Sequence, residues 1–147
     1  MGYTHYWRFN NIGIKASDLE ERYQRAVKDC QKIVRYAHIN GLVKLSGYTA
    51  HCKVGKYGGV VLNGTGDNAH ENFYLREHFK QNEDFNFCKT AQKPYDIVVV
   101  ACLAVLKHRL GDNIEVSTDG FLKDWVAGIN LARTVTKLKI KNPITKE

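Results

Sequence analysis

Hydrophobic residues recur at helical spacing between residues 17 and 39. They are Leu19, Tyr23, Ala26, Val27, Cys30, Ile33, Val34 and Ala37. Residues three or four apart lie on one side of an α-helix, so this pattern predicts an amphipathic helix that packs against a core. Ser17 and Glu20 have the spacing of a capping box, and Asn40-Gly41 is typical of a left-handed helix end. We therefore expect a helix over residues 17–39.

The longest apolar segment, Ile97–Leu106, has no polar side. Its β-branched residues favour a strand, whereas its length and its flanking residues favour a buried helix. Pro94 suits the start of a helix, and Lys107-His108-Arg109 followed by Gly111 suits the end of one. We expect a helix over residues 95–109.

Short runs of aromatic and β-branched residues between turn signals predict the strands. They are residues 3–9, 42–45, 50–54, 60–62, 71–75 and 114–117. Strands 60–62 and 71–75 could pair across the polar loop 63–68. A last amphipathic helix is expected from Phe121 to about Ile129. Because strands and helices do not alternate strictly, we expect an α+β fold, with a mixed or antiparallel sheet packed with about three helices.

Length and charge indicate one domain with a basic end. A chain of 147 residues can build a core without a metal ion or disulfides, and its four cysteines include no C-x-x-C pair. Residues 133–147 contain five Lys or Arg and one Glu, so they contribute +4 to the formal net charge of +7. We predict a domain over residues 1–132 and a basic tail over 133–147 that attracts polyanions weakly.

The sequence predicts a cytoplasmic protein with no membrane contact. No segment reaches the roughly 18 apolar residues that a membrane-spanning helix requires. The first residues, MGYTHY, lack the basic start and apolar middle of a signal peptide.

Residues 87–96, FCKTAQKPYD, place reactive groups directly in front of the buried helix 95–109. The Thr90 hydroxyl and the ammonium groups of Lys89 and Lys93 could surround a phosphate at the positive end of that helix. Alternatively, Cys88 could act as a thiolate nucleophile beside Lys89. We favour anion binding. Phe85 and Phe87 are expected to anchor this segment in the core, with Cys88 pointing the other way.

Two histidines are candidates for acid–base chemistry, because imidazole titrates near neutral pH. His5 could face a cleft together with Tyr3 and Trp7, which share its side of the predicted strand. A hydrogen-bonded core or surface position is the commoner alternative for such a histidine. His70 is either a general acid or base or a surface residue beside the loop, and in a strand the Glu71 side chain would point to the opposite face.

Neither a metal site nor a complete phosphate-binding loop is predicted. Position 74 is Tyr rather than the second His of a metalloprotease helix, and no spacing singles out a set of ligands. Residues 63–68 complete neither the P-loop pattern nor G-x-G-x-x-G, so a hairpin loop is favoured over a ligand loop that would include Asn63. Asp119 either caps the last helix or adds a carboxylate to the site.

Several motifs follow one another in a specific order. They are Tyr3-Thr4-His5-Tyr6-Trp7, Asn63-Gly64-x-Gly66 with His70-Glu71-x-Phe73, Phe87-Cys88-Lys89-Thr90 with Pro94-Tyr95-Asp96, and Ser117-x-Asp119-Gly120 with Asp124-Trp125. Over nearly the whole chain up to about Ile129, they resemble a family of small proteins encoded by bacteriophages and prophages. Thr118 stands where the family pattern has a second Ser. The resemblance implies a phage accessory protein that acts against host defences or on nucleotide metabolism, but no particular reaction.

These features lead to the hypothesis that the protein binds a small phosphate-bearing ligand, such as a nucleotide or a cyclic nucleotide signal. The rings of Tyr3, Trp7 and Tyr95 would stack on a base. The phosphate would contact Lys89, Lys93 and Thr90. The rest of the predicted ligand contacts are Asn63, Glu71, Cys88 and Asp119.

If the protein is also an enzyme, metal-free phosphodiester cleavage without a cofactor is the reaction that fits best. His5 and His70 would act as acid and base, and Lys89 would stabilise the developing charge. One alternative is a non-catalytic protein that sequesters a host signal or blocks a host protein. Another is a nucleic-acid accessory protein that binds through its basic tail.

Overall fold

The computed structural model describes residues 2–46 and 59–147. The strands and α-helices within these residues are β1 (Thr4–Phe9), α1 (Ala16–Ile39), β2 (Val60–Leu62), β3 (Phe73–Leu75), β4 (Phe85–Lys89), α2 (Asp96–Leu110), β5 (Ile114–Thr118) and α3 (Leu122–Thr136). An antiparallel sheet with the order β4-β1-β5 packs with the three helices, and β2 and β3 form a separate antiparallel hairpin. The predicted α+β class is confirmed.

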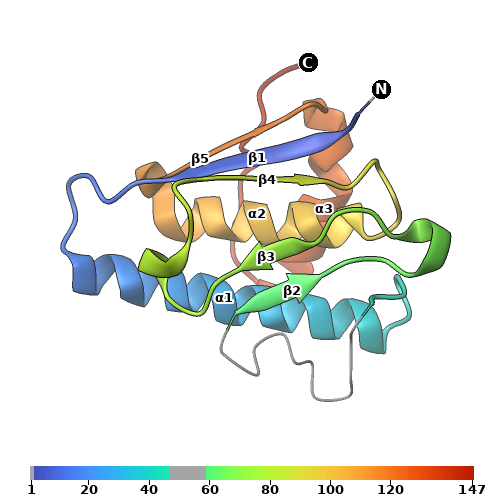
Figure 1. The fold of residues 1–147 in the computed structure, drawn as a ribbon, viewed down its shortest axis with the longest axis horizontal. Helices are drawn as coiled ribbons and strands as arrows, with labels where there is room; N and C mark the ends of the chain where they lie inside the picture. Colours follow the sequence, from blue (N-terminus) through green and yellow to red (C-terminus); the bar gives the residue numbers. More distant parts are fainter. Residues whose placement is uncertain (1, 47–58) are drawn as a thin grey trace.

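Helix α2 lies in the centre of the molecule. It contacts α1, α3 and β5, and Figure 1 shows it beneath the sheet. All residues from Val98 to Leu106 are buried. Contacts on several sides explain why this segment has no polar face in the sequence. The predicted helix is confirmed, and Gly111 follows it with a φ of 55°.

Helix α3 approaches α2 closely at Gly128. A Cβ atom added at this glycine would lie 2.7 Å from the Cβ of Val100 and 3.1 Å from the backbone oxygen of Ile97. Both distances are shorter than ordinary van der Waals contacts. The close packing of these two helices therefore requires a residue without a side chain at position 128.

The sheet has one covered face and one open face. Along β1, the side chains of His5, Trp7 and Phe9 are buried towards the helices, whereas Arg8 is exposed. Successive side chains of a strand point to opposite faces, so Tyr6 and Arg8 belong to the open face. No helix within the described residues covers this face in Figure 1. The covered face contributes to the core, and the open face remains available for binding.

Several predicted details differ from the structure. Residues 42–45 do not form a strand, and the predicted strand 50–54 lies outside the described residues. The expected capping box is absent, because α1 already begins at Ala16 and Glu20 instead accepts a hydrogen bond from Phe79 N. Strand β4 was not among the predicted strands. The predicted pairing across the polar loop is confirmed by the hairpin of β2 and β3.

The C-terminal residues pack against the domain. Helix α3 runs to Thr136, past the boundary expected between residues 132 and 133. Ile140 and Ile144 are buried, and Arg133 Nε donates a hydrogen bond to Ile140 O. The side chains of this segment are thus partly in the core. Within the described part of the chain, no helix is long and apolar enough to cross a membrane.

Candidate functional site

His5 is fully buried, and both nitrogens of its ring are bonded. Nε2 lies 2.6 Å from Asp96 Oδ1, and Nδ1 lies 2.8 Å from Thr118 Oγ1. The Thr90 hydroxyl donates a hydrogen bond of 2.6 Å to the same Asp96 oxygen. Because Asp96 is the first residue of α2 and Thr118 ends β5, this network ties the sheet to the start of the central helix.

Aromatic rings enclose the His5 network. Tyr3 and Trp125 both contact the imidazole edge-on, with ring centroids 5.1 and 5.3 Å away. Burial, followed by the charge of Asp96, raises the pKa of Tyr3 to about 12, so its phenol is protonated at neutral pH. His5 has neither an exposed surface nor a free nitrogen for a substrate. Both nitrogens are instead engaged within the protein, with Asp96 at the start of α2 and with Thr118 at the end of β5.

The three residues predicted to be catalytic do not share a cavity. His5 pairs with Cys88 and Thr4 with Lys89 in the β1–β4 ladder, so the side chains of His5 and Lys89 point to opposite faces of the sheet. His70 is exposed, and its backbone N–H and C=O bond to the Asn63 side chain. A fully buried His5 cannot line an open pocket with either residue.

The aromatic residues that were expected to stack on a base are in the core. Trp7 is 2% exposed and packs against Phe73, with ring centroids 5.2 Å apart. Tyr95 is fully buried, and its hydroxyl donates to Glu71 O. Tyr3 lies against the buried imidazole of His5. These three rings have no open face for a base in this structure.

The orientation predicted for the segment before α2 is wrong. Phe85 and Phe87 are 46% and 58% exposed, whereas Cys88 is fully buried. The Cys88 thiol contacts Glu71 O at 3.5 Å. Burial, followed by the charge of Glu71, raises the pKa of Cys88 to about 12, which opposes the formation of a thiolate nucleophile.

The other predicted ligand contacts mostly bond to the protein itself. The Thr90 hydroxyl is buried and bonds to Asp96, and the Glu71 carboxylate accepts a hydrogen bond from Lys89 N. Asn63 bonds to the backbone of the loop, and Asp119 accepts hydrogen bonds from Thr4 N and Tyr6 OH. Lys93 N donates to Thr90 O in the turn before α2. The phosphate site expected there is therefore not preformed, since its hydroxyl already has a partner.

The open face of the sheet carries a row of aromatic and basic residues. We call Tyr6, Arg8, Phe85, Phe87 and Lys89 the aromatic face. Tyr6 stacks near Phe85, with ring centroids 6.3 Å apart and an angle of 19° between the planes. The ring centroids of Phe85 and Phe87 are 6.2 Å apart, and the Arg8 guanidinium lies 5.1 Å from the Phe85 ring centroid. This surface includes one predicted site residue, Lys89.

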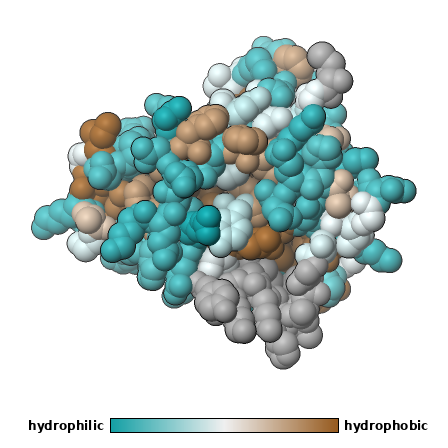
Figure 2. All heavy atoms as spheres, viewed as in Figure 1, coloured by the Kyte–Doolittle hydropathy of each residue, from teal (hydrophilic) through white to brown (hydrophobic). Residues whose placement is uncertain are grey.

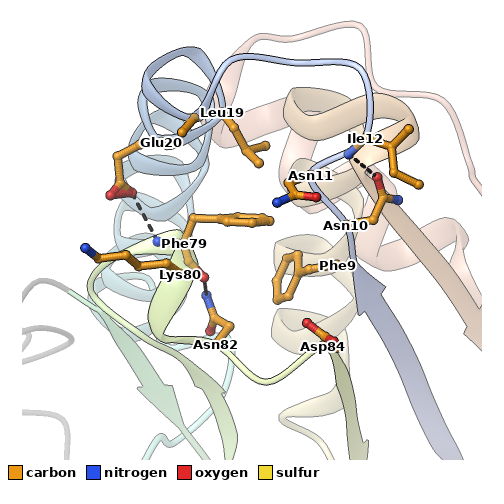
Figure 3. Close-up of a pocket in the computed structure, with 11 residues that line it drawn as sticks. Phe9, Asn10, Asn11, Ile12, Leu19, Glu20, Phe79, Lys80, Asn82 and Asp84 are labelled. Carbon is orange, nitrogen blue, oxygen red and sulfur yellow. Dashed lines mark hydrogen bonds between the residues drawn. The ribbon is translucent and has the colours of Figure 1, made fainter.

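A cavity of about 570 Å³ opens at one end of the molecule (Figure 3). It lies between the loop that joins β1 to α1 and the segment that leads into β4. Its lining residues are Phe9, Asn10, Asn11, Ile12, Ala16, Leu19, Glu20, Phe79, Lys80, Asn82 and Asp84. No sequence pattern marks this cavity, because its lining comes from two segments that are far apart in the chain.

The structure offers no evident metal centre in residues 2–46 and 59–147, where no group of three or more His, Cys, Asp or Glu side chains could hold an ion.

The raised pKa of Cys88 leads to a prediction about stability in alkali. Folding favours the protonated thiol, so this contribution is present below the ordinary thiol pKa of 9.0 and is lost as the pH rises towards about 12. Cys88→Ser removes the titrating group. Over the first pH unit above 9.0, we expect the variant to lose roughly 1 kcal/mol less unfolding free energy than the unmodified protein. Urea unfolding across this interval measures the difference, and equal losses would contradict the prediction.

The comparisons with known proteins assign neither a family nor a fold relative to the chain, because no family model, no curated protein and no solved structure matches it.

Proposed function

We propose that the protein binds single-stranded nucleic acid through the aromatic face. The observation that carries this proposal is the exposure of Phe85 and Phe87 beside Tyr6 on an uncovered antiparallel sheet. Large aromatic side chains are normally buried, so a contiguous exposed row marks a binding surface. Unpaired bases stack on such rings, because every base has a flat π-face.

The spacing of the rings suits consecutive bases. Phe85 and Phe87 are two residues apart on β4, which places them on the same face roughly 7 Å apart along the strand. Tyr6 stands directly across the ladder from Phe87. Its hydroxyl donates a hydrogen bond to Asp119, which fixes the ring in place. A preformed set of rings binds with a smaller loss of side-chain entropy than a flexible one.

Basic groups flank the rings at both ends. Arg8 lies over Phe85 at one end, and Lys89 follows Phe87 by two residues at the other. Both cations can contact phosphates of a strand whose bases lie on the rings between them. The net charge of +7 favours the approach of any polyanion.

Acidic groups limit the path of the strand. On β5, Glu115 pairs with Arg8 in the ladder, and Asp119 follows the end of this strand. Their carboxylates repel phosphates, so the strand is expected to run over β1 and β4 rather than over β5. The basic side of the sheet therefore defines the binding track.

The open geometry favours a polymer over a single nucleotide. Small ligands usually bind in pockets that enclose most of their surface, whereas this sheet face contacts only one side of a ligand. A strand of several nucleotides contacts several rings and both cations at once. The experiment below also tests the alternative that the protein binds a single small nucleotide.

The test compares Phe87→Ala with Tyr74→Ala. Tyr74 is a matched control, because its ring is also exposed and the Arg76 guanidinium lies 4.4 Å from the ring centroid. It lies on β3, in the separate hairpin rather than in the sheet that contains β1 and β4. We expect Phe87→Ala to weaken the binding of a fluorescent oligothymidylate at least about fivefold, and Tyr74→Ala to leave it unchanged. Fluorescence anisotropy at constant salt measures both affinities.

A second variant tests the charges separately. Arg8→Ala should lower the slope of log affinity against log salt concentration by about 0.7, the value for one phosphate contact on a single strand. Equal effects of Phe87→Ala and Tyr74→Ala would contradict the proposal, as would equal affinity for duplex DNA. Adenosine monophosphate that binds as tightly as the oligonucleotide would point instead to a small ligand. No binding of any strand would also refute the proposal.

A further inference from the structure

We propose that the cavity at the β1–α1 loop binds a small molecule with a flat apolar body and a protonated amine. This site is separate from the aromatic face, and neither proposal depends on the other. The volume of about 570 Å³ lies within the range of about 300–1,000 Å³ that is usual for small-molecule sites. The chemistry of the lining residues determines the class of ligand.

The inner wall of the cavity is apolar. Phe9, Leu19 and Phe79 line it, and the rings of Phe9 and Phe79 lie 5.2 Å apart at an angle of 71°. Figure 3 shows both rings and the Leu19 side chain directed into the same space. Perpendicular rings leave one ring face and one ring edge for a flat guest. A flat apolar ligand body therefore fits this wall.

The polar group best placed to select the ligand is Asp84. Its carboxylate and the Asn11 amide point towards the rings, whereas the Lys80 ammonium extends away from them (Figure 3). Among the described residues, no hydrogen bond or ion pair involves the Asp84 carboxylate. A cation in the cavity would be attracted by this carboxylate and by the nearby aromatic rings, whereas the carboxylate would repel an anion.

Backbone hydrogen bonds fix the position of this charge. The carbonyl of Asp84 accepts a hydrogen bond of 2.8 Å from Phe9 N, which extends the β1–β4 ladder by one residue. Asp84 is thereby held beside the ring of Phe9. The carboxylate is attached to a rigid element, as effective recognition requires.

The opposite wall is also fixed before any ligand binds. Glu20 accepts a hydrogen bond from Phe79 N, and Asn82 donates one to Phe79 O. On the loop side, Asn10 Oδ1 accepts a hydrogen bond from Ile12 N. The polar groups of Glu20, Asn82 and Asn10 are therefore engaged in holding the walls, and Asp84 and Asn11 remain for the ligand. A preformed site loses little entropy on binding.

The exposed part of the cavity lining includes an apolar residue, Ile12, beside polar ones. Ile12 lines the cavity and is 78% exposed. Figure 2 shows hydrophobic side chains gathered at the end of the molecule where the β1–α1 loop lies in Figure 1. An amphipathic ligand would cover this isoleucine. Burial of exposed apolar surface adds to the affinity of such a ligand.

The experiment uses three probes with the same ring and different ends. Phenethylamine is cationic, phenethyl alcohol is neutral and hydrocinnamate is anionic at neutral pH. We expect phenethylamine to shift the amide NMR signals of residues around Phe9 and Phe79. Phenethyl alcohol should bind with lower affinity, and hydrocinnamate should bind with the lowest affinity of the three. Equal or reversed affinities would overturn the assignment of an amine. The absence of shifts near the cavity with all three probes would overturn the site itself.

Asp84→Asn tests the carboxylate, and Glu83→Gln is its matched control. Both substitutions remove one negative charge from neighbouring exposed positions, but Glu83 does not line the cavity. We expect Asp84→Asn to weaken phenethylamine binding roughly threefold to tenfold and Glu83→Gln to change it less than twofold. Similar effects of the two variants would overturn the role of Asp84.

Ala16→Leu tests the cavity without changing any charge. Ala16 is an exposed lining residue at the start of α1, so a larger side chain can be added there without disturbing the core. We expect this variant to keep the circular dichroism and unfolding midpoint of the parent protein and to lose most phenethylamine binding. Unchanged binding in the folded variant would place the probe elsewhere and refute the proposal.

Discussion

Asp96→Ala is expected to lower the free energy of unfolding by about 3 kcal/mol. The Asp96 carboxylate is 15% exposed and accepts short hydrogen bonds from both His5 and Thr90, whose side chains are fully buried. Its removal leaves two buried polar groups without their acceptor, which costs more than the loss of an average hydrogen bond. Urea unfolding followed by circular dichroism measures the change.

Two further variants identify the cause of this loss. Asp67→Ala removes an exposed carboxylate from the short 3-10 helix Gly66–Asn68 and serves as the control for charge, so its effect should stay within about 0.5 kcal/mol. Asp96→Asn keeps an oxygen acceptor and should be less harmful than Asp96→Ala. If Asp67→Ala and Asp96→Ala were equally destabilising, the network around His5 would not hold the sheet to α2.

Gly128→Val is expected to lower the free energy of unfolding by about 2–3 kcal/mol. The added Cβ would lie 2.7 Å from the Cβ of Val100, a fully packed residue of α2. The two helices would have to separate, because backbone and β-branched atoms cannot rotate out of the way. The midpoint of urea unfolding should fall accordingly.

The neighbouring substitution Ala127→Val is the matched control for this experiment. It adds the same β-branched side chain to the same helix at an exposed position, so its effect should reflect helix propensity alone, less than about 0.7 kcal/mol. Helix propensity alone would favour valine over glycine at position 128, so equal destabilisation by Ala127→Val and Gly128→Val would show that contact with α2 does not explain the loss.

The helices could be predicted because their signals are local. The spacing of apolar residues gave α1 nearly from end to end, and Gly41, with a φ of 65°, follows it as expected. The central helix was predicted from its length and its flanking charges. The start of α1 differs by one residue from the prediction. The predicted capping box does not form, because Glu20 bonds to Phe79, far away in the sequence, rather than to its own helix end.

The orientation of β4 could not be predicted, because it depends on pairing. In the segment Phe85-Asn86-Phe87-Cys88-Lys89, hydrophobicity alone favours burial of the two phenylalanines. The register with β1 places Cys88 opposite His5 instead, and with it turns both phenylalanines to the open face. A shift of one residue would reverse every side chain of the strand.

The polar network was beyond sequence reasoning for a related reason. In the sequence, Asp96 stands out only as the last residue of one motif, and Thr118 only as a departure from another. Their common partner, His5, is 91 and 113 residues away from them. Local patterns contain no information about such distances. The cavity beside Asp84 likewise forms where separate segments meet.

The packing of the C-terminal residues has a practical consequence for mutagenesis. Ile140 and Ile144 belong to the core, and Lys146 O accepts a hydrogen bond from Leu122 N at the start of α3. A stop codon before Arg133 would therefore damage the last helix as well as remove positive charge, and the two effects would be confounded. Glutamine at Lys137, Lys139 and Lys141, which are all exposed, changes the charge and leaves the buried isoleucines in place.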